Sequence, residues 1–376
     1  MISMTKNKIT SWLKLLLVLI LVYFFLVSIG LMSASFKGFG KQFAESLLNS
    51  TSNPFIALFI GILATSLVQS SSTTTSIVVG MVASGVLTIE CAIPIVMGAN
   101  IGTTVTNTLV SLGHITRKEE FKRAIAGATV HDFFNLICVA IMFPLNLATG
   151  FLEKMAVGLS SLFVNVGGVK FTSPIKTVTK PLINLIKHFF VDELALQPKL
   201  AYSLTLAISV IILFLALYYI VRIMKSLVIQ TTEVALNNVL KKNAQWGILA
   251  GLFFTIIVQS SSITTSLLIP LIGAGIITIE VAFPVTMGAN IGTTATAILA
   301  SFATGNVAAI TIAFVHFIFN FIGVVFIYPI KIFRKIPIKL ALSLGELADK
   351  NRIYALLYVV GLFFILPVIL ITISKL

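Results

Sequence analysis

Long apolar runs separated by short polar segments are the main pattern along this sequence. The predicted spans of the two halves are 15–32, 54–112, 125–149, 201–222, 246–302 and 308–331, with one more at 353–374. A transmembrane helix needs about 20 predominantly apolar residues, whereas membrane β-barrels show alternating segments of about ten residues. The continuous runs therefore predict an all-α polytopic membrane protein.

Two of these runs, 54–112 and 246–302, are too long for one helix and too interrupted for two ordinary ones. In the first, apolar residues 54–68 stop at Gln69-Ser70-Ser71-Ser72, and apolar residues then resume until Thr88. Irregular backbone survives within a membrane only where protein or a water-filled cavity satisfies it. We interpret the pattern as a re-entrant helical hairpin followed by a helix broken at Gly98–Gly102, with the same arrangement in the second half.

The sequence contains an internal repeat. Residues 69–108 align without a gap to residues 259–298, with 22 identities in 40 positions. The duplicated segments are Gln-Ser-Ser-Ser at 69–72 and 259–262, Met-Gly-Ala-Asn-Ile-Gly-Thr-Thr at 97–104 and 287–294, and a His and Asn four residues apart at 131–135 and 316–320. We divide the chain into a first repeat at 1–149, a linker at 150–200, a second repeat at 201–331 and an extra transmembrane helix within 332–376.

Each half has three predicted crossings, because a re-entrant hairpin returns to its own side. Three is odd, so the second repeat is expected to be inverted relative to the first. The segment 114–123 carries four Lys and Arg residues, whereas its counterpart 303–306 carries none. The positive-inside rule places the first inside and the second outside. The first run, at 15–32, resembles a secretory signal in its flanks, but a span also precedes the second motif at the same distance, so we expect a retained helix.

The duplicated polar clusters predict a binding site. Broken helices at corresponding positions of inverted repeats are the best sequence indication of a transporter's midplane site. The alternative is that each hydroxyl bonds its own helix backbone or a neighbouring helix, and the paired glycines could equally mark a close helix crossing. The motifs contain no Lys or Arg, so an oxyanion would be held by N–H dipoles and hydroxyls. Burying it requires a countercharge, and the oxygen ligands suit a hard cation such as Na⁺.

The ionisable residues of the membrane region are few. Glu90 and Glu280 follow a Thr by two residues, which is typical of the first turn of a helix after its N-cap. His131 and His316 are expected to form hydrogen bonds between helices rather than to bind a ligand. Asp132 has no counterpart in the second half, and an intramembrane carboxylate is a candidate functional group.

Composition agrees with this picture. The chain is 58% hydrophobic and 10% charged, against about 25% charged residues in soluble domains. The net charge of +14 lies in short segments, as the positive-inside rule predicts, and indicates no nucleic-acid partner. Cys91 and Cys138 lie in apolar surroundings and are expected to be unpaired. We find no Cys and His spacing typical of a zinc site.

The doubled motifs, together with the segment Ala126–Asn135, resemble the type II sodium-dependent phosphate cotransporter family, in a compact bacterial-type form. The resemblance covers about half the chain, residues 54–149 and 244–331. It implies a multi-pass protein of the cell (inner) membrane that is not an enzyme, needs no cofactor beyond Na⁺ as coupling ion, and takes up inorganic phosphate. Lipid is a further partner, and an oligomer is allowed but not indicated.

On this reading, phosphate lies between the two hairpin tips near the membrane midplane. The residues expected to bind phosphate are Gln69, Ser70, Ser71, Ser72, Gln259, Ser260, Ser261 and Ser262. The residues expected to bind sodium are Thr74, Thr75, Asn100, Thr103, Thr104, Thr264, Thr265, Asn290, Thr293 and Thr294. A passive anion channel with re-entrant repeats and a symporter of another small anion are the alternatives. A membrane enzyme using a Ser with His131 and Asp132 is disfavoured, because a catalytic triad has no reason to be duplicated.

Overall fold

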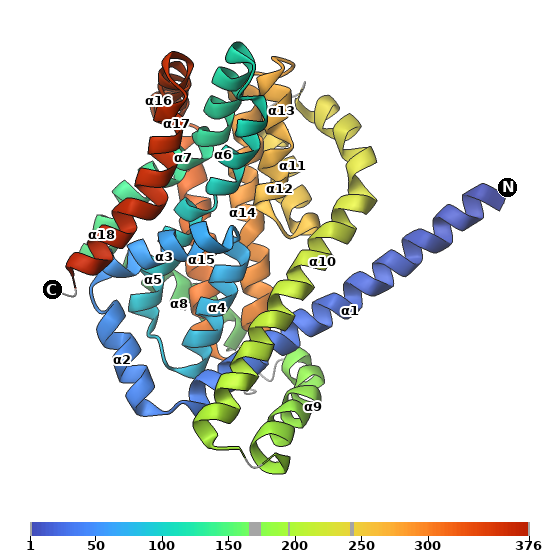
Figure 1. Ribbon diagram of the computed structural model, residues 1–376, viewed down its shortest axis with the longest axis vertical. Helices are drawn as coiled ribbons and strands as arrows, with labels where there is room; N and C mark the ends of the chain where they lie inside the picture. Colours follow the sequence, from blue (N-terminus) through green and yellow to red (C-terminus); the bar gives the residue numbers. More distant parts are fainter. Residues whose placement is uncertain (1, 165–173, 195, 241–243, 375–376) are drawn as a thin grey trace.

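The computed structural model describes residues 2–164, 174–194, 196–240 and 244–374, and every element assigned within them is a helix (Figure 1). The elements of the first half are α1 (Ile2–Gly38), α2 (Lys41–Thr51), α3 (Pro54–Val68), α4 (Ser71–Ser84), α5 (Ile89–Gly102), α6 (Val105–Ser111), η1 (Leu112–His114) and α7 (Lys118–Thr149). The fold class is therefore the predicted one, all-α and rich in apolar helices.

The remaining elements include the segment between the repeats, the second repeat and the C-terminal region. They are α8 (Phe151–Val164), α9 (Pro174–His188), η2 (Phe189–Glu193), α10 (Pro198–Leu240), α11 (Ala244–Val258), α12 (Ser261–Ser266), α13 (Leu268–Gly273), α14 (Ile279–Thr304), α15 (Val307–Ile327), α16 (Lys331–Lys350), α17 (Ile353–Val360), η3 (Gly361–Ile365) and α18 (Leu366–Ile373). The expected linker at 150–200 thus contains helices: α8 packs on α15, and α9 packs on α1.

Six helical segments in the described part of the chain are long and apolar enough to cross a membrane. They are Trp12–Gly38, Ile89–His114, Lys118–Thr149, Pro198–Met224, Val307–Ile327 and Ile353–Ile373. They match the expected crossings except the one within 246–302, since α14 is not among the six. The long helices α1 and α10 pack along each other at one side of the molecule, and α16 to α18 lie at the opposite side (Figure 1).

Each half contains a pair of short helices that meets at the Gln-Ser-Ser-Ser motif. The first hairpin comprises α3 and α4, joined at Gln69 and Ser70, and the second comprises α11 and the pair α12 and α13, joined at Gln259 and Ser260. The returning helix of the second hairpin is divided at Leu267. Pro270 accounts for the division, because it has no N–H to donate to the carbonyl four residues earlier.

The helix break expected at the duplicated glycines is found in the first half and not in the second. In the first half, α5 ends at Gly102 and α6 begins at Val105, so the helix is interrupted at Thr103 and Thr104. In the second half, α14 is continuous through Gly288–Gly292. The glycines allow close packing against the hairpins: a Cβ on Gly98 would overlap the Leu58 carbonyl oxygen, and one on Gly288 would overlap that of Ile248. The close-crossing interpretation of these glycines therefore holds in both halves, and in the first half the crossing stands beside a helix break.

Candidate functional site

The two glutamines at the hairpin tips have an unusual backbone conformation. Gln69 has a φ of 57° and Gln259 a φ of 58°, and they are the only non-glycine residues with positive φ in the described part of the chain. This left-handed conformation ends the first helix of each hairpin and reverses the chain, with the Gln69 N–H donating to the Thr65 carbonyl at 2.7 Å. Non-glycine residues rarely adopt it, and strain of this kind concentrates at functional sites.

The serine after each glutamine begins the returning helix. Ser70 caps α4 by accepting a hydrogen bond from the Thr73 N–H at 3.2 Å, and Ser260 caps α12 by accepting from the Ile263 N–H at 3.4 Å. Ser N-caps of this type are favoured because they satisfy one of the free N–H groups at a helix start. The first-turn N–H groups of both returning helices therefore lie at the hairpin tips.

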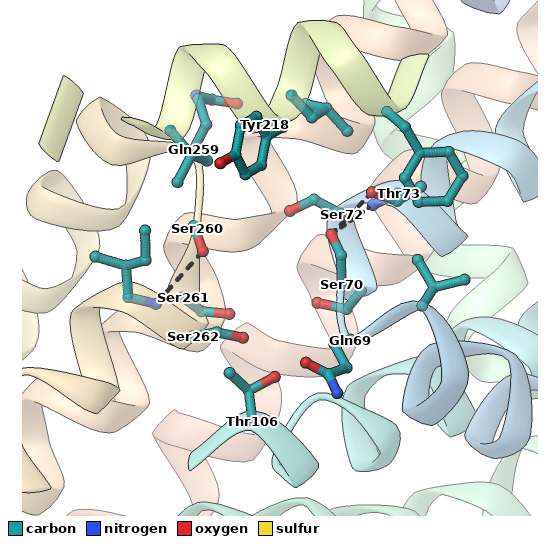
Figure 2. A pocket seen from close by; sticks show the side chains of 16 residues that line it. Gln69, Ser70, Ser72, Thr73, Thr106, Tyr218, Gln259, Ser260, Ser261 and Ser262 are labelled. Carbon is teal, nitrogen blue, oxygen red and sulfur yellow. Dashed lines mark hydrogen bonds between the residues drawn. The ribbon is translucent and has the colours of Figure 1, made fainter. Parts of the chain in front are cut away.

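A cavity of about 290 Å³ lies between the two tips. Figure 2 shows the Gln-Ser-Ser-Ser segments facing each other across it, with Thr106 at one edge and Tyr218 at another. The residues lining it include all eight predicted for phosphate: Gln69, Ser70, Ser71, Ser72, Gln259, Ser260, Ser261 and Ser262. The structure therefore brings the two halves of this predicted set together.

Four of the six serines that line the cavity differ from the two N-caps Ser70 and Ser260. Ser71, Ser72, Ser261 and Ser262 are buried, and their hydroxyl groups make no hydrogen bond to another described residue. The threonines that follow behave differently: the Thr75 hydroxyl donates to the Ser71 carbonyl at 2.8 Å and the Thr265 hydroxyl to the Ser261 carbonyl at 2.9 Å. The interpretation that each hydroxyl bonds its own helix backbone is thus correct for these threonines, but not for Ser71, Ser72, Ser261 and Ser262.

The residues predicted for sodium do not line the cavity. Most of their hydroxyls bond carbonyls of their own helices, as Thr103 does to Ala99 and Thr293 to Ala289, both at 3.0 Å. Some also connect elements: the Thr264 hydroxyl lies 2.6 Å from that of Thr255. These buried side chains are divided between the hairpin helices α4 and α12 and the segments that contain the duplicated glycines.

Asn100 and Asn290 lie in a buried network with the two histidines. His131 Nε2 is hydrogen-bonded to Asn290 Oδ1, and Asn290 Nδ2 donates to Asn135 Oδ1 at 2.8 Å. The related contact joins His316 Nε2 to Asn100 Oδ1 at 3.1 Å. Each histidine therefore bonds the opposite half of the chain, which confirms that the histidines form hydrogen bonds between helices.

The two halves are not in identical states. Thr296 donates to Gln259 Oε1 at 2.7 Å, whereas Thr106, its counterpart, lies beside Gln69 in Figure 2 with a buried hydroxyl that has no partner among described residues. Likewise Asn100 Nδ2 and Asn320 Oδ1 have no partner in the described part of the chain, although their counterparts Asn290 and Asn135 bond each other. The second hairpin is thus held by contacts that the first lacks.

Asp132 is fully buried on α7. Tyr358 of α17 donates to its Oδ2 at 3.3 Å, while Oδ1 has no hydrogen-bond partner among described residues. This carboxyl group does not line the cavity. The glutamates agree with the capping interpretation: Glu90 and Glu280 lie in the first turns of α5 and α14, after the N-cap residues Thr88 and Thr278.

The chemistry of the cavity follows from its lining. Its polar groups are amides, hydroxyls and helix N–H groups, and none of the lining side chains is ionisable except that of Tyr218. No group of three or more His, Cys, Asp or Glu residues that could hold a metal occurs among the described residues. Both cysteines are free. Such a lining can hold an oxyanion by hydrogen bonds but supplies no positive side chain to neutralise it.

Sequence reasoning missed one wall of the cavity. Phe214, Leu217, Tyr218 and Val221 line it from α10, and Thr106 lines it from α6. Thr106 lies 37 residues after Gln69, as Thr296 does after Gln259, so the repeat alignment could have indicated this pair. The face of α10 carried no signal, because its apolar residues are indistinguishable in sequence from residues that contact lipid.

Comparisons with known proteins agree with the duplicated motifs. The family described as Na⁺/Pi-cotransporter matches residues 24–170 and 212–341. The chain is 35% identical to sodium-dependent phosphate transport protein 2B of Homo sapiens, over 96% of this chain and 66% of the human one, and also 35% identical to protein 2B of Pongo abelii, over 94% and 64%. It is 36% identical to protein 2A of Rattus norvegicus, over 97% and 68%. The chain thus spans just under two thirds of the length of the two 2B relatives, and no solved structure matches it.

Proposed function

The chain belongs to the Na⁺/Pi-cotransporter family, and on that premise we propose that it is a sodium-coupled symporter that carries inorganic phosphate into the cell. The observation that carries the proposal is the cavity between the hairpin tips, where both Gln-Ser-Ser-Ser segments meet with four unbonded serine hydroxyls. The relatives named above are sodium-dependent phosphate transport proteins. Transport, rather than catalysis, is the activity of this family.

Phosphate fits this lining by shape and by hydrogen bonding. Its oxygens can accept from the hydroxyls of Ser71, Ser72, Ser261 and Ser262 and from the first-turn N–H groups of α4, whose N-terminus carries a partial positive charge. The Gln69 amide adds a donor at one edge, and Gln259 Nε2, which already donates to the Ile256 carbonyl at 2.6 Å, has one hydrogen left to donate. A tetrahedral anion bound between two tips would contact both halves of the chain at once.

Sodium supplies the missing positive charge. Burying a charged anion without a countercharge is strongly unfavourable, and the cavity offers no Lys or Arg. Hydroxyl and carbonyl oxygens are hard ligands that suit Na⁺. We propose that Na⁺ binds among the threonines and asparagines around the hairpins after their hydroxyls release their helix carbonyls. Each ion then binds well only when the other is present, which is the physical basis of coupling.

Inverted repeats would let one site open to either side in turn. In this proposal the first hairpin enters from outside and the second from the cytoplasm. The unequal contacts of Gln69 and Gln259 support this. In a transporter built from inverted repeats, each hairpin is expected to take up the arrangement of the other when the site opens to the opposite side.

The test is uptake of radiolabelled phosphate by proteoliposomes containing the purified full chain. We expect accumulation above equilibrium with an inward Na⁺ gradient and none with K⁺ or with a proton gradient in Na⁺-free buffer. Arsenate, which shares the shape and protonation of phosphate, should compete well and sulfate poorly. Uptake that reaches equilibrium without Na⁺ would identify a passive channel, and effective competition by sulfate but not arsenate would identify a different anion.

A further inference from the structure

Asn107 of α6 joins the two halves of the chain beside the cavity. Its side chain is buried, and its Oδ1 accepts a hydrogen bond from the Ser266 hydroxyl at 3.0 Å. The Thr265 hydroxyl lies 2.9 Å from the same oxygen and can donate either to it or to the Ser261 carbonyl. Both donors end α12, the helix that begins with Ser261 and Ser262. A residue of the first repeat therefore holds the helix that carries the cavity-lining serines of the second.

The same element forms part of the cavity wall. Thr106, the residue before Asn107, lines the cavity and lies beside Gln69 in Figure 2. Asn107 does not line the cavity; its side chain reaches α12 instead. A displacement of α12 relative to α6 would break the bonds of Asn107, so this side chain couples the position of the second hairpin to a wall built by the first repeat.

The first hairpin lacks the corresponding contact. The counterpart of Asn107 is Ala297, 190 positions later, which is buried in α14. α14 packs on α4 as α6 packs on α12. The counterpart of Ser266 is Ser76, whose buried hydroxyl has no hydrogen-bond partner in the described part of the chain. An alanine side chain offers that hydroxyl no acceptor, so the sequence difference at 107 and 297 accounts for the difference in bonding.

The short helix α12 needs an external contact to hold its position. It contains six residues, and the returning helix is divided directly after it, at Leu267. Helices shorter than about 12 residues are marginal on their own. In the first hairpin the returning helix α4 is continuous over 14 residues and packs on α1, whereas α10, the counterpart of α1, packs on the entering helix α11. The Asn107 contact thus gives α12 support that α4 receives from its length and from apolar packing.

We propose that Asn107 is a positioning residue for phosphate binding, which holds α12 so that the hydroxyls of Ser261 and Ser262 stay at the cavity. This inference rests on the function proposed above. Asn107 acts through α12 and does not touch the anion. Without it, α12 is displaced in part of the molecules, and the apparent affinity for phosphate falls in proportion to the fraction in which the serines are correctly placed.

Hydrogen exchange and phosphate uptake together test the proposal in the full chain. The variants are Asn107→Ala, which removes the acceptor, and Ser266→Ala, which removes one donor and keeps Asn107 in place. The matched control is Thr311→Val, which removes a buried hydrogen bond of the same length, 3.0 Å, between Thr311 of α15 and Ser160 of α8. Mass spectrometry reports amide exchange at 261–273 and 71–84, and proteoliposomes give KM and kcat for phosphate.

Asn107→Ala should accelerate exchange at 261–273 about tenfold and Ser266→Ala about threefold, because one neutral hydrogen bond changes an equilibrium by roughly two- to twelvefold. Exchange at 71–84 should not change. In Asn107→Ala the KM for phosphate should rise about fivefold while kcat stays within about twofold, since fewer molecules hold the serines in place. Thr311→Val should leave exchange at 261–273, KM and kcat unchanged.

A double-mutant cycle separates positioning from general stabilisation. Asn107→Ala combined with Ser261→Ala should raise KM by well under the product of the two single effects, because both changes act on the same serine. Combined with Ser71→Ala of the other hairpin, it should reach the product, since the effects of separate sites add in free energy.

Unchanged exchange at 261–273 in Asn107→Ala, an unchanged KM, or equal additivity with both serines would each overturn the proposal. Absence of phosphate uptake by the unmodified chain would contradict the proposed function itself. The exchange rates do not depend on transport and would still decide whether Asn107 holds α12.

Discussion

Arg123 of α7 donates a hydrogen bond from Nε to the carbonyl oxygen of Gly273, at 2.9 Å, where the returning helix of the second hairpin ends. A related contact exists at the first hairpin, where Asn306 Nδ2 donates to the Ala83 carbonyl at 3.0 Å. Ala83 and Gly273 are separated by 190 positions, the same offset as Gln69 and Gln259. The base of each hairpin is therefore held by a residue near the start of the closing span of the other half.

Releasing one of these contacts is predicted to loosen only the hairpin that it holds. Arg123→Gln should raise the rate at which a thiol reagent labels Ala274→Cys, and Asn306→Ala should raise the labelling of Ser84→Cys, in a background with Cys91 and Cys138 replaced. A hydrogen bond that involves a charged group contributes about 1.5–3 kcal/mol, and a neutral one about 0.5–1.5 kcal/mol. The expected increases are therefore about tenfold or more for Arg123→Gln and roughly threefold for Asn306→Ala.

The control for each variant is the reporter cysteine of the other hairpin, which should label at an unchanged rate. If either variant accelerated both reporters equally, the contacts would be general stabilising bonds of the fold rather than ties for single hairpins.

The unbonded serines are predicted to dominate substrate binding. Ser71→Ala and Ser261→Ala should each raise the KM for phosphate about tenfold or more, because a hydrogen bond to a charged ligand contributes about 1.5–3 kcal/mol. Ser66→Ala is the matched control, because its hydroxyl donates to the Ile62 carbonyl of its own helix at 2.7 Å and Ser66 does not line the cavity. If both cavity variants transported phosphate with kinetics near those of the unmodified protein, the serines of the hairpin tips would have only a structural role.

The His-Asn network predicts unequal effects of two related substitutions on stability. Asn290 bonds both His131 and Asn135 through its side chain, whereas the side chain of Asn100 bonds only His316. Asn290→Ala leaves Asn135 Oδ1 without a partner and leaves His131 Nε2 only its 3.2 Å contact to Asn135 Nδ2, and an unpaired buried polar group costs about 1–3 kcal/mol. It should lower the thermal unfolding temperature in detergent more than Asn100→Ala does. Equal decreases in the unfolding temperature would show that the difference in hydrogen bonding between the two halves does not affect stability.

The duplicated glycines are predicted to be needed for packing. Gly98→Ala would drive a Cβ into the Leu58 carbonyl oxygen, and backbone on both sides leaves no flexible atom to move. Overpacking of this kind costs about 1–3 kcal/mol or more, so the variant should unfold at a clearly lower temperature. Gly113→Ala, where a Cβ would meet nothing within 4 Å, serves as the control and should leave the temperature unchanged. A tolerated Gly98→Ala would contradict the close crossing.

The sequence predicts that the hairpin tips meet. Buried hydroxyls without partners are unfavourable, so two duplicated polar clusters within apolar runs are expected to line one common water-accessible site. It could not decide between an unwound turn and a tight crossing at Gly98–Gly102, since glycine permits both. Nor could it reveal the wall formed by Phe214 and Tyr218, because apolar residues that face a cavity and those that face lipid follow the same pattern. Tertiary packing alone distinguishes these cases.

The last prediction concerns sidedness, on which alternating access depends. If the halves are inverted, the base of the first hairpin faces outside and that of the second faces the cytoplasm. In the same background lacking Cys91 and Cys138, an impermeant thiol reagent added outside should label Ser84→Cys and spare Ala274→Cys. Reagent supplied only at the cytoplasmic face should reverse this pattern, because each reporter lies at the end of a helix that returns to its own side. Labelling of both reporters from one side would mean that the halves are parallel, and a cavity between parallel hairpins could not be opened to the two sides by exchanging their local arrangements.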